Sequence, residues 1–345
     1  MNKEACKRPR PILKQRKLSG EKLSQYVRQL FEKRGREAFE LARKAVLQEA
    51  EKLECKTVRD ALHYLANYWT DTTRPALLSI ACKAAGGDPD ATEPIAVPLV
   101  LICEAVDIHD DIIDQSVTKG NHLTLYGKFG KEIALLIGDA LLFKGLAMLH
   151  EAEGKISHKK MKAILRITNE LFFELGDAEA LELSLKNQGT NLKIEDYLAM
   201  VRKKAADVEA YLRISAILAN APREQIEALA QYGRVLGMLI ILGDDNSDMF
   251  NPLEIINRVR NEALPLPILY ALQDQALREK VIQILTKKRI DKKDTEELFE
   301  LTHQTGGFSN TASQLRALMQ KGKENLLVIK NCPELERILE STYPE

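Results

Sequence analysis

The chain has 345 residues, which is enough for one large domain or two domains of ordinary size with a sizeable core. Lysine plus arginine and aspartate plus glutamate number 50 each, so no net charge attracts nucleic acid or an anionic membrane surface, and neither is an expected partner. The 5 cysteines are scattered and never spaced as Cys-x-x-Cys, which argues against a disulfide framework or a zinc site and is typical of a cytoplasmic protein.

Residues 1–20 form a basic segment that is interrupted by prolines. Its cations include Lys7, Arg8, Arg10, Lys14, Arg16 and Lys17. Because the segment lacks the apolar core of a secretory signal, we predict a flexible arm. We find no apolar stretch that reaches the length of about 20 residues needed to span a membrane, so stable membrane insertion is not expected.

From residue 21 onward, nearly every segment has the apolar period of an α-helix, and the alternation typical of strands is almost absent. No shift in composition marks a domain boundary. Residues 21–345 are therefore predicted to form a single all-α domain, a large antiparallel helical bundle around a central cavity. One of its long helices is expected to run from Thr190 to Arg213 and to carry Lys203 and Lys204.

A first acidic cluster follows the apolar run from Ile95 to Val106 and consists of Asp110, Asp111 and Asp114. These carboxylates lie one helical turn apart, and like charges at that spacing destabilise a helix. A solvated outer face is one explanation. A bound cation is the other, because carboxylates at the end of a buried helix are costly unless something compensates them.

A second cluster repeats the pattern after the apolar run from Val235 to Leu242, with Asp244, Asp245 and Asp248. Two such clusters that met across a cavity would hold Mg²⁺. When a few carboxylates bind Mg²⁺, phosphate commonly supplies its other ligands. The repetition favours a metal site over two solvated faces, although a helical binding module with solvated acids remains an alternative.

Three stretches resemble the trans-isoprenyl diphosphate synthase (polyprenyl synthase) family. They are the HDDxxD motif from His109 to Asp114, the KFG step from Lys128 to Gly130 and the GDALL motif from Gly138 to Leu142. The second cluster lies where that family carries its second aspartate motif, and the match runs from about Trp69 to Leu272. The resemblance implies an isoprenoid synthase-like fold, a homodimer and three Mg²⁺ ions between the two motifs.

The resemblance also implies roles for individual residues. Asp110, Asp114 and Asp244 would be the catalytic metal ligands, and the ligand set would be completed by Asp111, Asp245 and Asp248. Arg74, Lys119 and Lys204 would contact diphosphate oxygens. Ala105 and Val106 would form the floor of the prenyl pocket; their small size predicts a chain of roughly fifteen carbons or more, unless Ala105 merely packs against a neighbouring helix.

The departures from the family pattern are concentrated on the site for isopentenyl diphosphate. In the segment from Trp69 to Pro75 only Arg74 and Pro75 match, Asp71 replaces a lysine and Thr72 replaces an arginine. Cys103 replaces a histidine. An anionic substrate would meet the carboxylate of Asp71 where the family offers an ammonium group, which reverses the sign of the interaction.

The allylic side is altered less. Lys119 and Gly120 stand where the family has two arginines, Glu179 and Glu182 replace its glutamine and aspartate, and its lysine after the second motif is missing. Arg258 and Arg260 are candidates to replace that lysine.

Three functions follow as hypotheses. The first is a Mg²⁺-dependent enzyme that ionises an allylic prenyl diphosphate and transfers the prenyl group. The second is cyclisation, elimination or hydrolysis as in class I terpene synthases, or transfer to an acceptor other than isopentenyl diphosphate. The third is a non-catalytic subunit of a heteromeric synthase, although such subunits usually lose their aspartates.

Overall fold

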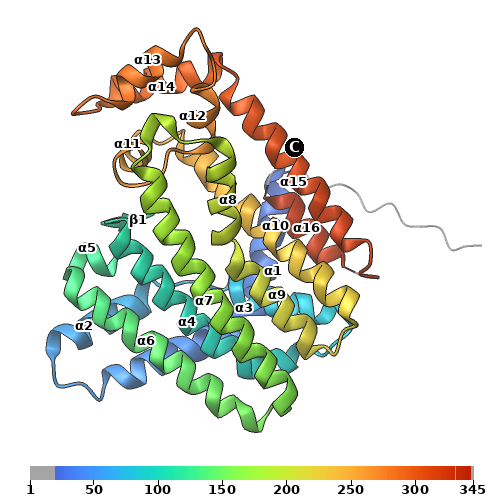
Figure 1. Ribbon diagram of the computed structural model, residues 1–345. Helices are drawn as coiled ribbons and strands as arrows, with labels where there is room; N and C mark the ends of the chain where they lie inside the picture. The colour runs from blue at the N-terminus through green and yellow to red at the C-terminus, as the bar shows by residue number, and fades with distance from the viewer. Residues whose placement is uncertain (1–19, 331, 343–345) are drawn as a thin grey trace, which may run out of the picture.

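The computed structural model describes residues 20–330 and 332–342. The predicted basic arm lies outside the described residues, except for Gly20, where the first helix begins. The described part is almost entirely helical (Figure 1), which confirms the all-α prediction. Its strands are a hairpin of two residues each, β1 (Thr118–Lys119) and β2 (His122–Leu123), directly after the first acidic cluster.

The bounds of the helices follow in chain order. The first half contains α1 (Gly20–Ala50), α2 (Lys56–Tyr68), α3 (Thr73–Ala84), η1 (Pro89–Thr92), α4 (Glu93–Ile113), α5 (Leu125–Phe129), α6 (Lys131–Glu151), η2 (Ala152–Gly154) and α7 (His158–Lys186). The second half contains η3 (Gly189–Asn191), α8 (Ile194–Lys204), α9 (Ala206–Leu218), α10 (Arg223–Asp248), α11 (Pro252–Asn261), α12 (Leu266–Ala271), α13 (Arg278–Leu285), α14 (Lys292–Gln304), α15 (Gly307–Leu326) and α16 (Pro333–Ser341).

Helix α4 is a central helix that carries the first acidic cluster, and α6 packs along it. Glycines allow this close approach. A Cβ atom on Gly145 would lie 2.5 Å from the Ile102 side chain and 2.8 Å from the carbonyl oxygen of Pro98. A Cβ atom on Gly138, in the GDALL motif, would lie 2.7 Å from the ring of His109. The motif glycine therefore serves helix packing beside the acidic cluster.

Helix α10 carries the second acidic cluster and packs along α9. Here too a glycine lies at the contact, since a Cβ atom on Gly237 would come within 2.8 Å of the Ala205 side chain. The predicted long helix from Thr190 to Arg213 was wrong in this region, because α8 ends at Lys204 and α9 begins at Ala206. Ala205, pressed against Gly237, has ψ near 8° and interrupts the helix.

The expectation that no apolar stretch reaches membrane-spanning length was also wrong. By length and composition alone, two helices in the described part of the chain are long and apolar enough, Lys131–Gly154 and Arg223–Asp248. In the second, 61% of the apolar window is buried, so packing within the protein accounts for its apolarity. The first is only 33% buried, and it leaves Leu136 and Phe143 exposed.

Candidate active site

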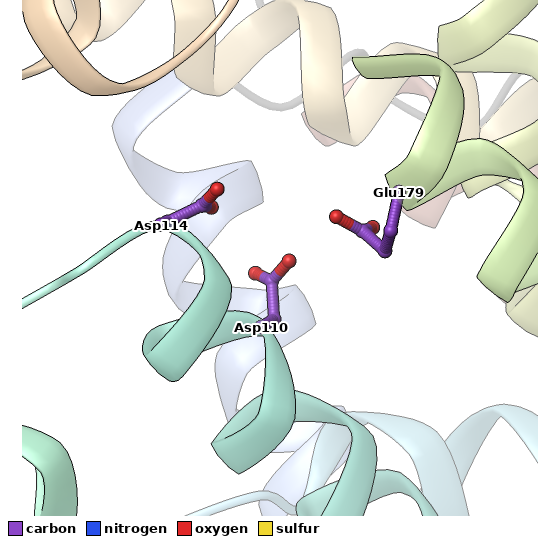
Figure 2. Close-up of side chains that lie close together, drawn as sticks. All are labelled: Asp110, Asp114 and Glu179. Atoms are coloured by element: carbon purple, nitrogen blue, oxygen red, sulfur yellow. The ribbon is translucent and has the colours of Figure 1, made fainter. Parts of the chain in front are cut away.

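The first acidic cluster lies at the carboxyl end of α4. Asp110 and Asp111 occupy its last turn, and Asp114 is the residue after its last helical position. The helix stops because Gln115 adopts a positive φ of 56°, a conformation that ends α-helices. Asp110 and Asp114 thus point their carboxylates from successive turns into the same space (Figure 2).

Glu179 of α7 joins these two aspartates, and Figure 2 shows the three carboxylates turned toward one another. One oxygen of each lies within 4.8 Å of the others, which is close enough to share one metal ion. The Asp110 Oδ1 and Glu179 Oε2 atoms are buried and accept no hydrogen bond within the described residues. Unsatisfied, buried carboxylate oxygens of this kind fit a hard cation such as Mg²⁺.

The pKa values of these carboxyl groups reflect the free-energy cost of burying several carboxylates close together. Burial, together with the nearby Asp110 carboxylate, raises the pKa of Asp111 and of Asp114 to about 7. Burial also raises the pKa of Glu179 to about 8, although Lys204 opposes the rise. A bound cation would stabilise the charged forms and remove this cost.

Lys204 is the cation at the centre of the first cluster. Its Nζ atom lies 3.1 Å from Glu179 and 3.8 Å from Asp110, and it also forms an ion pair with Glu182. Burial favours the neutral amine, but Glu182 and Asp110 outweigh it and raise the pKa of Lys204. Because α8 ends at Lys204, the interruption at Ala205 places this side chain among the carboxylates.

The second cluster divides into one exposed and two engaged aspartates. Asp245 is 0% exposed, and its carboxylate accepts a hydrogen bond from Tyr197 and pairs with Arg258 at 2.8 Å. Asp248 pairs with the Nε atom of Arg258 at 2.7 Å. Asp244 is exposed and forms no ion pair within the part of the chain that the structure describes. Of the three, Asp244 therefore has its oxygens most available to a ligand.

Charged neighbours common to both clusters indicate that the clusters lie near one another. Burial dominates the raised pKa values of Asp114 and Asp245, and the Glu182 carboxylate adds to both. Lys119 in turn opposes the burial-driven rise in the pKa values of Asp111 and Asp244. Lys119 itself is exposed and lies 4.0 Å from Asp111.

A cavity of about 700 Å³ opens beside the first cluster and extends between α3, α4, α7 and α10. Asp110, Asp111, Lys119 and Lys204 line its polar end. Its apolar lining includes Leu77, Ile102, Val106, Leu171, Phe172, Leu175, Val208, Ile240 and Ile241. Val106 belongs to this lining, and its place at the floor of the pocket stays a prediction. Ala105 is 0% exposed and is not part of the lining, so the structure favours the alternative in which it packs inside the bundle.

Arg74 also lines this cavity, where it lies among acidic side chains. Its guanidinium donates to both oxygens of Asp107 at 2.8 and 2.9 Å, and to Asp71 at 3.1 Å. Its Nε atom lies 3.7 Å from Asp207. The predicted diphosphate contact of Arg74 therefore competes with three carboxylates. Cys103, in the position of the family's histidine, contacts the hydroxyl of Tyr211 instead.

Several residues of this site were not predicted from the sequence. Glu179 was identified only as a departure, although Glu179 and Glu182 are spaced to share a face of α7. Asp107 of α4 also belongs to the site, and nothing in the sequence pattern indicated its pairing with Arg74. Arg258, a conjectured replacement cation, does lie at the second cluster, whereas Arg260 is exposed.

The fold and the two acidic clusters indicate the class of protein. A solved structure, the geranylgeranyl pyrophosphate synthetase from Pyrococcus horikoshii, superposes with a TM-score of 0.82 at 23% identity and covers 93% of this chain and 99% of that one. The family model described as polyprenyl synthetase matches residues 55–302. The chain belongs to the polyprenyl synthetase family.

Among curated relatives, geranylgeranyl diphosphate synthase from Methanosarcina mazei is 27% identical over 282 residues, which are 81% of this chain and 86% of the relative. The (2E,6E)-farnesyl diphosphate synthase from Mycobacterium tuberculosis is 31% identical over 205 residues, which are 58% of this chain and 56% of that protein.

Proposed function

We propose that the protein is a Mg²⁺-dependent prenyltransferase that ionises an allylic prenyl diphosphate and transfers its prenyl group. The observation that carries this proposal is the convergence of Asp110, Asp114 and Glu179, with Asp244 near enough that Lys119 acts on both Asp111 and Asp244. Names of relatives, such as geranylgeranyl diphosphate synthase and farnesyl diphosphate synthase, support the reaction class.

The carboxylates have separate tasks in this proposal. Asp110, Asp114 and Glu179 would hold Mg²⁺ on one side of the diphosphate, and Asp244 would hold it on the other, with three ions expected from the resemblance. Bound Mg²⁺ neutralises the charge that develops on the departing diphosphate. Asp111, Asp245 and Asp248 would lie next to the metal ligands and help to hold them in position. For Asp245 and Asp248 this agrees with their pairing to Arg258.

The remaining groups bind and shield the substrate. Lys204 and Lys119 would donate to diphosphate oxygens, as preorganised ammonium groups at the rim of the cavity. The apolar lining, with Val106 in its wall, would hold the prenyl chain and exclude the water that quenches a carbocation. The cavity volume of about 700 Å³ supports a chain of roughly fifteen carbons or more.

A second function remains a candidate because of the acceptor side. Arg74 is engaged by Asp107 and Asp71, so its guanidinium is not free to bind isopentenyl diphosphate. This favours either transfer to a different acceptor or a reaction of the allylic substrate alone, such as cyclisation, elimination or hydrolysis. A non-catalytic subunit is less well supported, because both acidic clusters are present and such subunits usually lose their aspartates.

We also propose a homodimer, a single domain and a cytoplasmic location. The exposed apolar side chains of Leu136 and Phe143 on α6 and of Phe173 on α7 would be covered by a second copy. The first and last helices, α1 and α16, pack together, which supports one domain over residues 21–345. Four cysteines are free thiols, as is usual in a reducing compartment.

The test is product analysis by mass spectrometry. Purified protein is incubated with Mg²⁺ and geranyl, farnesyl or geranylgeranyl diphosphate, with and without isopentenyl diphosphate. We expect pyrophosphate release that is reduced about a thousandfold in Asp110→Asn and in Asp244→Asn. Elongation requires a longer chain when isopentenyl diphosphate is present, and cyclisation gives a hydrocarbon or alcohol without it. Pyrophosphate release that is insensitive to both substitutions would refute the proposal.

A further inference from the structure

The part of the cavity around Arg74 corresponds to the isopentenyl diphosphate site of the family and is called the acceptor half below. It contains more acids than its single guanidinium can neutralise. Asp71, Glu104, Asp107 and Asp207 all line this region, together with Arg74. Three of these carboxylates lie within ion-pair distance of Arg74. Glu104 does not. The charge of Lys119 also acts on Glu104 and Asp107, but the four carboxylates still outnumber these two cations.

Glu104 is the residue that indicates a ligand. Its side chain belongs to the cavity lining, and the residue is only 7% exposed. Among the residues that the structure describes, no hydrogen bond or ion pair reaches its carboxylate. Burial raises the pKa of Glu104 well above the usual range, and the nearby Asp107 adds to the rise. A buried carboxylate without a partner is costly, and it gains most from a cation that enters the cavity.

Aromatic rings line the same part of the cavity. Trp69 and Tyr68 both contribute to its wall, and Trp69 is 5% exposed. The faces of indole and phenol rings attract ammonium ions, and this attraction grows when water is excluded. Acids and aromatic rings together are therefore complementary to a positive charge and unfavourable for a diphosphate.

We propose that the acceptor half binds the ammonium end of a small organic acceptor, with Glu104 and Asp107 as its counter-ions. This inference rests on the proposed function only for the statement that the bound molecule accepts the prenyl group. On transfer, the C1–O bond of the allylic substrate breaks and its electron pair leaves with the diphosphate. A neutral hydroxyl or alkene of the acceptor supplies the pair for the new bond to C1 and releases one proton to the departing diphosphate.

A transient carbocation is the other positive charge that this site could meet, and it fits the pocket less well. A carboxylate is a nucleophile toward such a cation and would trap it as an ester. An ammonium ion forms no such bond with a carboxylate. The four carboxylates therefore favour a permanent cation on the acceptor.

The experiment compares three probes of the same shape, isopentylammonium, isopentanol and isopentyl phosphate, by calorimetric titration of the intact protein at low ionic strength. We expect the ammonium probe to bind most tightly and the phosphate least tightly. Glu104→Gln should weaken the ammonium probe by about tenfold or more, which is typical of a lost charge-assisted contact. Glu132→Gln, an exposed glutamate on α6, is the matched control and should leave the binding unchanged.

Asp107→Asn provides a result that misfolding does not produce. It removes one counter-ion and releases Arg74, so it should weaken the ammonium probe and strengthen the phosphate probe. If phosphate binds more tightly than ammonium to the unmodified protein, or if neither Glu104→Gln nor Asp107→Asn weakens binding of the ammonium probe, the inference is wrong. These titrations need no catalysis, so they test the cation site separately from the proposed function. Absence of pyrophosphate release would refute the proposed function and leave the cation site intact, and absence of ammonium binding would do the opposite.

Discussion

Arg258 allows a quantitative test of how the second acidic cluster is held. Its guanidinium lies 2.8 Å from Asp245, 2.7 Å from Asp248 and 3.1 Å from Glu262. Asp245 is 0% exposed, and the Arg258 side chain is 17% exposed. A carboxylate this deeply buried depends on its cation, because solvent does not screen it.

Arg258→Met keeps most of the aliphatic stem and removes the charge. Loss of one partner from a buried ion pair costs about 3–5 kcal/mol, since the other charge stays buried without compensation. The hydrogen bond from Tyr197 to Asp245 remains in the variant and places the expected loss toward the lower end of that range. The free energy of unfolding, measured by urea titration with circular dichroism, reports the loss directly.

Two further variants make the result specific. Arg260→Met, on the exposed face of the same helix, should change the free energy of unfolding by no more than about 0.5 kcal/mol. Asp245→Asn in the Arg258→Met background should recover part of the loss, because the uncompensated charge is then gone. A loss below about 1 kcal/mol in Arg258→Met, or no recovery in the double variant, would show that Arg258 does not compensate Asp245 in this way.

Three other outcomes are expected. Lys204→Met should lower the rate of pyrophosphate release by about a hundredfold. Lys203→Met should leave that rate near normal, because Lys203 pairs with Asp177 at the surface. Equal effects of the two variants in a steady-state assay would contradict the role of Lys204 in binding diphosphate. Glu104→Gln should raise the free energy of unfolding at pH values above the unfolded-state pKa of glutamate and should have little effect at lower pH. The reason is that folding raises the pKa of Glu104, so its charged form opposes folding. Urea titrations at about pH 8 and about pH 4 test this sign, and a gain in stability confined to the lower pH would contradict it. Treatment with EDTA should abolish pyrophosphate release and added Mg²⁺ should restore it, whereas activity that survives chelation would exclude a role for the metal.

Local pattern was sufficient for the fold class and for the main elements of the site. The helical period and the scarcity of strand signals predicted an all-α chain, and the family model confirms the resemblance that the aspartate motifs carried. The two acidic clusters could be identified in the sequence because each follows an apolar run that had to be buried. Lys204 could be placed near them only through the resemblance.

Other features depend on which helix faces meet, and the sequence did not reveal them. Glu179 joins Asp110 and Asp114 because α7 crosses the end of α4, and that crossing is set by packing between helices far apart in the chain. Asp245 has the same sequence pattern as Asp111, yet it turns inward to Tyr197 and Arg258.

The sequence by itself thus determined the kinds of helix and the supply of carboxylates, because both depend on neighbours within a few residues. Only the tertiary structure decided which carboxylates share a cation and which are engaged by a partner. Arg74 illustrates the difference. Its motif predicted a diphosphate contact, but the packing of α3 against α4 places its guanidinium beside Asp107. The electrostatic energy of a charge depends on which groups folding brings within a few ångströms of it.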